Sequence, residues 1–448
     1  MRIDKLYLLC LPALAALSAA AVADTEPARL TALKGLAPVS ALPAAPLAVN
    51  QSVTDDIQNG VAPHPTLLPF PEQQRQALSD AFITSANAAG LADGLGSKLG
   101  AAYRARAKYT SADDGKTTQS TNLTDAVAAL IAVAYKTAAA DAGAGKFFFA
   151  NGTTDGKTPV EHDALDILMT ICGTIDVFGK AYGLPAGTKG ADIYGNSRPF
   201  QTTPHLLDYA GKDYFGVDSK NTYYLYGPAQ KLVDSPSYPS GHTTYGYTES
   251  LVLALLVPAR YGQMVVRGAE YGDDRIIIGA HYAMDVLGGR TLASYDLAQL
   301  LAGTPGYGDG KIGNFAKALD DARTEATRLL ENDCGGAITA CAKADTSRFA
   351  DPARNARFYE STQTYGLPVV FKETAKGPED VAKLAPEAGW LLKAAFPALS
   401  LAEADAILTQ TEGPGGGFLD NGSAFGVYSR LDLYRASEKA RTLAPAAR

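Results

Sequence analysis

The sequence predicts a mainly α protein. Several long segments carry apolar residues at helical spacing and end at a glycine, which is the pattern of amphipathic helices. Strictly alternating polar and apolar runs, the pattern of half-buried strands, are rare. The chain has 448 residues, of which 46% are hydrophobic. It is therefore long and apolar enough to bury one large core or about two to three smaller ones.

The N-terminus predicts a secretory signal peptide. Arg2 and Lys5 precede an apolar run over residues 6–21, and small residues around Ala23 suit cleavage there. A retained N-terminal membrane anchor is the alternative. We expect export of the mature chain to the periplasm or the medium.

Helical patterns begin at about residue 76. The first such segment ends at Gly90, and the second begins at a cap on Thr121 or Thr124 and ends at Gly143. Further helices are expected over residues 160–183, 240–261, 281–301, 314–332 and 387–396. Residues 184–238 between them are rich in Gly, Pro, Asp and Tyr, and long loops in compact domains are often functional.

The cysteines point to an oxidising compartment. Cys334 and Cys341 lie seven residues apart and are expected to close a small disulfide loop. Zinc is the rival interpretation, but no histidine or third cysteine is nearby in the sequence. Cys172 lies in an apolar helical segment and is expected to be a buried free thiol.

The charge and hydropathy of the chain argue against two classes of partner. The net charge is −7, whereas a nucleic-acid-binding protein normally carries a basic excess. After the signal peptide no segment reaches the ~20 uninterrupted apolar residues of a membrane span, since the apolar run 251–257 stops at Pro258. We expect no nucleic-acid partner and no integral membrane segment in the mature chain.

A first chemical motif is Pro-Ser-Gly-His, residues 239–242. Ser240 can cap the following apolar helix, and Gly241 lets an anion approach the backbone closely. His242 stands on the first turn, where it can exchange a proton near neutral pH. An ordinary capped helix with a surface histidine is the plain alternative.

A second motif is Arg-x5-His-x3-Asp, formed by Arg275, His281 and Asp285. On a helix His281 and Asp285 would share a face, and the carboxylate could then accept a hydrogen bond from one ring nitrogen. That bond fixes the tautomer and leaves the other nitrogen free as a nucleophile. A surface His–Asp pair of small energetic weight is the alternative.

With Arg198-Pro199 upstream, the three blocks in this order resemble the superfamily of type 2 phosphatidic acid phosphatases, bacterial class A acid phosphatases and vanadium haloperoxidases. The resemblance covers roughly residues 120–300, and the second and third blocks carry its specificity. It implies a helical bundle of the acid phosphatase/haloperoxidase type.

The resemblance also implies a catalytic mechanism. His281 would attack phosphorus and form a phosphohistidine, and Asp285 would orient and stabilise it. His242 would protonate the leaving alkoxide and then activate the hydrolytic water. No metal and no cofactor is implied.

The same resemblance implies a phosphate-binding set. Arg198, Arg275, Ser240 and the amide of Gly241 would hold the phosphoryl oxygens. Such a set suits phosphoryl transfer, which needs fixed positive charge and donors where negative charge develops. The planar guanidinium group in particular matches phosphate geometry.

Two positions depart from the family pattern. The family has a lysine seven residues before the Arg of Arg-Pro, and this chain has Ala191 there. Lys189 is the nearest lysine, so it is the candidate phosphate ligand, provided that the glycine-rich backbone around it is irregular. Asp274 stands where the family usually has serine, and we expect its carboxylate to point outward or to pair with Arg275.

Four regions follow from the motifs. They are the signal peptide 1–23, an irregular N-terminal arm 24–75, a helical phosphatase-like catalytic domain 76–302 and a C-terminal extension 303–448 in which we interpret no motif.

The leading hypothesis is an exported, metal-independent acid phosphatase acting on small phosphomonoesters. A vanadate-dependent haloperoxidase, with vanadate as its cofactor, is the first alternative. A non-catalytic phosphate-binding protein on the same fold is the second. The natural substrate and the oligomeric state are left open.

Overall fold

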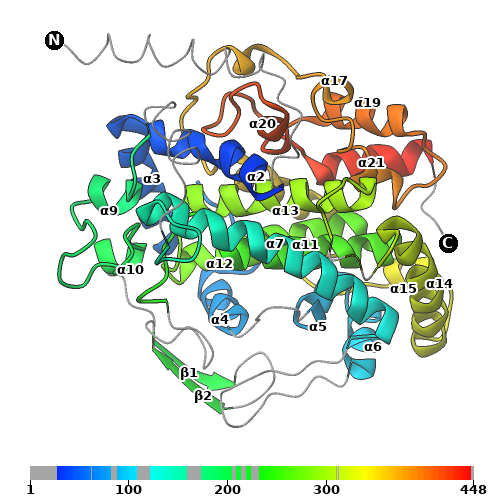
Figure 1. Cartoon of the computed structure of the whole chain (residues 1–448). Helices are drawn as coiled ribbons and strands as arrows, with labels where there is room; N and C mark the ends of the chain where they lie inside the picture. The colour runs from blue at the N-terminus through cyan, green and yellow to red at the C-terminus, as the bar shows by residue number, and fades with distance from the viewer. Residues whose placement is uncertain are drawn as a thin grey trace.

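The computed structural model describes residues 28–444 except positions 62, 82–87, 108–121, 159–172, 204–207, 213–217, 223–231, 309 and 311. The predicted signal peptide therefore lies outside the described residues, as do Cys172 and most of the helix expected at 160–183. The fold is mainly α, as predicted (Figure 1). Within the described residues the strands are β1 (Asp208–Lys212) and β2 (Asp218–Thr222), which pair antiparallel as one hairpin.

The helices fall into three groups along the chain. The N-terminal group is α2 (Ala28–Leu36), η2 (Ala37–Ala41), α3 (Ala44–Gln58), α4 (Phe70–Asp80), α5 (Ala88–Leu91), η3 (Ala92–Leu95) and α6 (Leu99–Arg106). The central group is α7 (Asp125–Asn151), α9 (Val177–Ala181), α10 (Pro199–Thr202), α11 (Gly241–Leu256), η4 (Pro258–Arg260), α12 (Tyr261–Ile277) and α13 (Ala283–Ala302). The C-terminal group is α14 (Phe315–Cys334), α15 (Ile338–Lys343), α16 (Pro352–Thr364), η5 (Thr374–Lys376), α17 (Val381–Leu384), α18 (Trp390–Lys393), α19 (Leu401–Thr411), α20 (Ala424–Tyr428) and α21 (Leu433–Leu443).

Helix α11 is the centre of the bundle. It packs against α7, α12, α13 and α14, and every one of its residues except His242 and Tyr245 is buried. This is why its sequence is apolar on all sides rather than on one stripe. His242 and Tyr245 are half-buried and three residues apart, so the partly exposed face of α11 is confined to its first turn.

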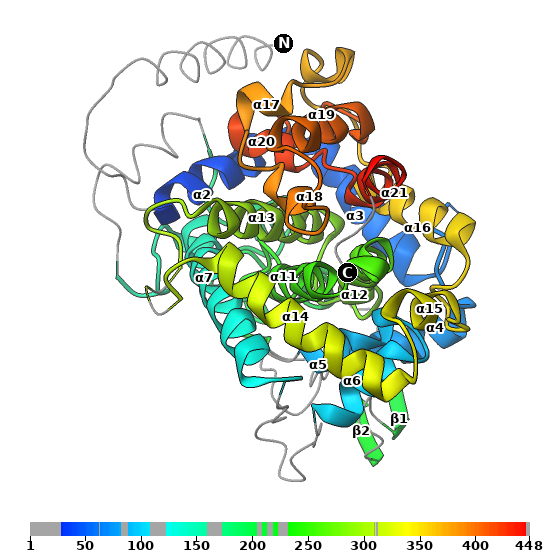
Figure 2. The same cartoon turned by 90° about the vertical axis from the view of Figure 1, so that its right-hand side faces the viewer.

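The C-terminal extension packs on this bundle. Helices α17, α19 and α20 lie above α13 in both views, with α4 and α6 on the opposite side of the bundle (Figures 1 and 2). Helices α16 and α21 contact α12, and α18 contacts α13. A disulfide joins Cys334 at the end of α14 to Cys341 in α15.

The N-terminal arm is not irregular, so that expectation was wrong. Residues 28–58 form α2, η2 and α3, with Pro38 in the first turn of η2 and Pro43 just before α3. Proline is tolerated at these positions because a helix needs no N–H donor there. The alanine-rich segments between the prolines favour the helical state.

The expected end of the second helix at Gly143 was also wrong. Helix α7 is capped by Thr124, one of the two predicted caps, whose side chain accepts a bond from the Val127 N–H. It then continues to Asn151 and ends at Gly152 in the left-handed conformation. A Cβ on Gly145 would lie 3.1 Å from Cδ of Pro239. Glycine therefore serves here for close helix packing and not as a stop.

Helix α7 is the one described helix that is by itself long and apolar enough to cross a membrane. It contacts α2, α11, α13 and α14, and it carries buried Asp141 and Lys146. These contacts are those of a core helix in a folded domain. The helices around residues 31–58 meet the same criteria only as a sharply bent pair.

Buried ion pairs fix α12 to the surrounding elements. Arg267 donates to both carboxylate oxygens of Asp80, at 2.6 and 2.8 Å, and to Asp93 at 2.8 Å. Arg348, from the C-terminal extension, donates to Asp93 and Glu270 at 2.7 Å. Breaking one partner of such a buried pair is costly because it leaves an uncompensated charge.

We predict that Gly143→Ala and Gly145→Ala have different effects on stability. Alanine at position 143 meets no atom within 4 Å, so it should raise the free energy of unfolding by about 0.5–1 kcal/mol through helix propensity. Alanine at position 145 presses on Pro239 and should give no such gain. Denaturant unfolding of both variants measures this, and an equal gain at both positions would show that α7 needs no glycine for its contact.

We predict that stability falls between acidic and neutral pH, partly through Asp273. Burial, followed by the charge of Glu270, raises the pKa of Asp273 from 3.8 to about 8. Its contribution is therefore fully present below pH 3.8 and is lost as the pH rises toward 8. At pH 7, Asp273→Asn should be more stable than the parent by up to about 4 kcal/mol. At pH 4 the two should be nearly equal, and a pH-independent difference would contradict the prediction.

Candidate active site

The predicted site residues converge at the N-terminus of α11. Arg198 lies just before α10, and its Nη1 is 2.9 Å from Nε2 of His281. The same guanidinium donates to the carbonyl oxygens of Ser235, Pro236 and Ala280 at 2.6–3.1 Å. Arg198 thus joins the loop before the Pro-Ser-Gly-His turn to the segment that precedes α13, and it is fully buried.

The tautomer of His281 follows from its two partners. Arginine is always a donor, so Nε2 of His281 must accept the bond from Arg198 and carry a lone pair. Nδ1 lies 3.2 Å from Oδ2 of Asp285 and must be the protonated nitrogen. The nitrogen that faces Arg198 is therefore the one able to act as a nucleophile.

Asp285 is held firmly in this position. Its Oδ2 accepts bonds from the Tyr282 N–H at 2.9 Å and from the Ser237 hydroxyl. His281 precedes α13 by two residues, so the expected pairing along a helix face is replaced by a pairing across the helix start. Burial raises the pKa of Asp285 to about 7, against the opposing effect of these bonds and of the charges on Lys146 and Arg198.

The Pro-Ser-Gly-His turn forms the part of the site at the start of α11. The side chain of Ser240 accepts from the Thr243 N–H at 3.1 Å and caps α11, as predicted. The Ser240 N–H donates to the Asp285 carbonyl at 3.0 Å. The first N–H groups of α11 have no carbonyl partner within the helix and carry a partial positive charge. An anion at this end would meet Gly241 and His242.

Sequence reasoning missed one member of the group, which is Lys146 on α7. Its ammonium donates to the Pro236 carbonyl at 2.7 Å and lies 3.5 Å from the Ser237 carbonyl. A Cβ on Gly241 would be 3.1 Å from Cε of Lys146, so the lysine runs along the first turn of α11. The helix was predicted to end at Gly143, so Lys146 was not considered as part of it.

The structure does not support Lys189 as the missing lysine. Its side chain is exposed on the loop between α9 and α10, whereas Arg198, Ser240, Gly241 and Arg275 are buried. The backbone there is irregular, as the prediction required, with Gly187 and Gly190 both at positive φ. The irregular loop nevertheless leaves the side chain in solvent.

The expectation that Asp274 points outward was wrong. It is fully buried on α12 rather than exposed, and its carboxylate accepts from Nε2 of Gln73 at 2.8 Å. Burial and the charges of Asp80 and Glu270 raise its pKa well above the ordinary value. Asp274 therefore belongs to the ion-pair cluster around Arg267. Arg275 is buried in the last turn of α12.

The electrostatics of the site favour an anion. Burial lowers the pKa of His242 well below 6.5, and the charges of Arg275, Arg198 and Lys146 lower it further. Burial and the same three cations also lower the pKa of His281. Asp192 faces this group from the loop before Arg198, and burial raises its pKa to about 7. Both histidines are thus neutral when the site holds no anion.

The donors present do not suit a metal cation. Three cationic side chains crowd His281, and positive neighbours repel a metal ion. Among the described residues, no cluster of three or more His, Cys, Asp or Glu side chains is placed to hold a metal.

Two tyrosines lie beside the Pro-Ser-Gly-His turn. Tyr245 packs edge-on against Tyr135 at 4.9 Å between centroids and lies 5.8 Å from the His242 ring. Tyr238 is fully buried instead, and its hydroxyl donates to the Leu36 carbonyl. Tyr238 thus supports the turn from the core side, while the half-buried Tyr245 lies beside His242.

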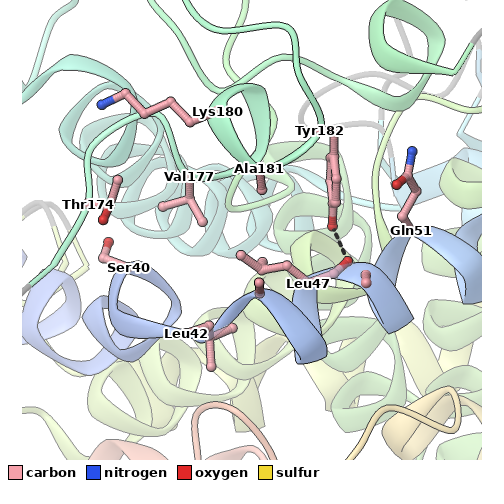
Figure 3. Close-up of a pocket in the computed structure, with 11 residues that line it drawn as sticks. Ser40, Leu42, Leu47, Gln51, Thr174, Val177, Lys180, Ala181 and Tyr182 are labelled. Atoms are coloured by element: carbon pink, nitrogen blue, oxygen red, sulfur yellow. Dashed lines mark hydrogen bonds between the residues drawn. The ribbon is translucent and has the colours of Figure 1, made fainter. Parts of the chain in front are cut away.

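A separate surface pocket of about 440 Å³ lies between α3 and α9 (Figure 3). The Tyr182 hydroxyl donates to the Leu47 carbonyl at its edge. The Tyr182 ring packs at 4.9 Å from Tyr282, the residue after His281. The pocket includes none of the predicted site residues.

The region of this chain that matches known proteins contains the motif residues of the candidate site. The family model of the PAP2 superfamily matches residues 179–298. An acid phosphatase of Zymomonas mobilis is 40% identical over 90 residues, which are 20% of this chain and 33% of that protein. A non-specific acid phosphatase of Providencia stuartii is 30% identical over 180 residues, 38% of this chain and 67% of that protein. A non-specific acid phosphatase of Salmonella typhimurium is 45% identical over 64 residues, 14% of this chain. The aligned region spans only 26% of that Salmonella protein.

We predict that sulfate binds this site more tightly as the pH falls. Sulfate stays a dianion across the range, and its charge raises the pKa of the neutral histidines, so binding takes up protons. Neutralisation of Asp192 and Asp285 near pH 7 acts in the same direction. Calorimetry from pH 8 to 5 should show affinity rising by up to about tenfold per pH unit for each proton taken up.

The matched controls for this measurement are His242→Asn and His64→Asn. The first should flatten the pH dependence, and the second should leave it unchanged because His64 lies outside the site. A pH-independent affinity in the parent protein would refute the electrostatic description.

Proposed function

This chain belongs to the PAP2 superfamily, and from that premise we propose that it is an exported acid phosphatase that hydrolyses small phosphomonoesters through a phosphohistidine. The observation that carries the proposal is the pairing of His281, with Nε2 facing Arg198 and Nδ1 facing Asp285. The matched relatives that are named acid phosphatases support the same reaction class.

The first half-reaction forms the covalent intermediate. Nε2 of His281 attacks phosphorus, the bond to the alkoxide breaks, and His242 gives the alkoxide a proton. Arg198 donates to Nε2, so substrate must redirect that bond to a phosphoryl oxygen. Asp285 stabilises the positive charge that develops on the imidazole ring, as in other base-and-orienter pairs.

The second half-reaction restores the enzyme. His242, now neutral, takes a proton from water, whose oxygen attacks phosphorus and displaces Nε2. Arg198, Arg275 and the first-turn amides of α11 hold the phosphoryl oxygens in both steps, where fixed donors stabilise charge without reorganisation. Ser240 adds its hydroxyl at the cap. No step requires a metal.

Acidic pH suits this mechanism. His242 must be protonated to act as an acid, and the surrounding cations lower its pKa. Bound phosphate opposes that effect because a negative charge favours the protonated ring.

Export is supported by the N-terminal pattern of Arg2 and Lys5 before an apolar run and by the Cys334–Cys341 disulfide, since disulfides persist in oxidising compartments.

We predict metal-independent hydrolysis of p-nitrophenyl phosphate that is lost in His281→Ala. Asp285→Asn should lower kcat by several orders of magnitude because it no longer fixes the tautomer. His64→Ala should retain full activity. Hydrolysis is measured from about pH 4 to 8 with chelator present, and activity that depends on added metal would contradict the mechanism.

His242→Ala separates the two half-reactions. p-Nitrophenolate leaves without a proton, so phosphorylation proceeds, whereas the hydrolytic step lacks its base. Labelled phosphoenzyme should therefore accumulate in His242→Ala and be absent from His242→Ala/His281→Ala.

If the parent is inactive at every pH, peroxide-dependent bromide oxidation with added vanadate would support the haloperoxidase alternative. Phosphate binding with neither activity would support the non-catalytic one.

A further inference from the structure

Lys146 is a buried cation that the motifs do not account for. Its side chain is 8% exposed, and it reaches the site from α7, far outside the three motif blocks. The ammonium contacts two carbonyl oxygens, those of Pro236 and Ser237. An ammonium has three donors.

Two cations and two carboxyl groups act on the charge of Lys146. Burial and the charges of Arg198 and Arg275 lower its pKa well below 10.5, while Asp285 and Asp192 act in the opposite direction. The two carboxyl groups are themselves half neutral near pH 7, and the two histidines are neutral. Placing a third cation here is unfavourable unless an anion occupies the space between them.

The position of Lys146 is fixed by its helix. Gly145 brings α7 against Pro239, since even a Cβ there would be 3.1 Å from the proline ring. Phe147, the next residue, packs edge-on against Tyr194 at 5.3 Å between centroids. The lysine is thereby held beside the first turn of α11, with its Cε next to Gly241.

We propose that Lys146 is a phosphate-binding residue and supplies from α7 the ammonium group that this chain lacks at Ala191. This inference rests on the proposed phosphatase function. Ala191 is buried and Lys189 is exposed, so the loop before Arg198 contributes no cation at that place. A dianion bound at α11 is held by Arg198, Arg275 and Lys146, and its charge keeps Lys146 protonated.

The test compares Lys146→Met with Lys189→Met. Methionine fills a similar volume without charge, and loss of a charge-assisted contact should weaken inhibition by inorganic phosphate about 10- to 100-fold. KM for p-nitrophenyl phosphate should rise in the same variant. Lys189→Met should stay within about twofold of the parent in both quantities. Phosphate inhibition that is unchanged in Lys146→Met, or lost in Lys189→Met, overturns the proposal.

A second readout distinguishes phosphate binding from a purely structural role. If Lys146 only held the Pro236 and Ser237 carbonyls, Lys146→Met would lower the melting temperature and keep the increase that phosphate produces. The proposal expects that phosphate-dependent increase to be largely lost, and to be partly restored in Lys146→Arg. Retention of the full increase in Lys146→Met overturns it.

The thermal readout also separates this proposal from the proposed function. If the parent binds phosphate but has no phosphatase activity, the function fails while Lys146 is still tested by the phosphate-dependent shift. If the parent hydrolyses substrate and Lys146→Met responds to phosphate as the parent does, the function stands and the Lys146 proposal fails. A parent that neither binds phosphate nor hydrolyses substrate overturns both.

Discussion

Asp285 connects the two halves of the site through both its side chain and its backbone. Its carboxylate accepts from His281 Nδ1, the Tyr282 N–H and the Ser237 hydroxyl. Its carbonyl accepts from the Ser240 N–H. One residue at the start of α13 therefore fixes the nucleophile and also positions the cap of α11. The distance between the nucleophile and the anion-binding turn depends on this connection and on Arg198, which joins the same two segments.

The second constraint is charge. The site buries Arg198, Arg275 and Lys146 around two histidines, and burial of like charges costs free energy. The rest of the fold has to hold them in place. Arg198 does so by donating to three carbonyl oxygens, and Lys146 by the packing of α7 on Pro239. The stored repulsion favours a dianion, which is the charge of a phosphoryl group in transfer.

The buried carboxyl groups extend this balance beyond the site. Asp273 and Asp274 on α12 have raised pKa values, caused first by burial. Each raised pKa makes the folded state relatively more stable in acid than at neutral pH. The same pH range favours protonation of His242. Stability and the proposed chemistry thus change with pH in the same direction, because both come from ionisable groups that are kept out of water.

The sequence alone predicted the mainly α class, the cap at Ser240 and a cap at either Thr121 or Thr124. Through the family resemblance it also pointed to His242, His281, Asp285, Arg198 and Arg275 as candidate site residues. These depend on local patterns, since a cap and a motif spacing are properties of neighbouring residues. The tertiary structure decided the length of α7, the identity of the buried lysine and the side to which Asp274 points. Gly143 was predicted to end this helix, yet α7 continues through it to Asn151. At Gly145 the close contact with Pro239, almost a hundred residues away in the chain, outweighs the cost of about 1 kcal/mol per glycine. Spacing along the chain favours Lys189, the lysine nearest to Arg198, and gives no reason to choose Lys146. Only the packing of α7 against α11 brings Lys146 to the site, whereas Lys189 lies in solvent.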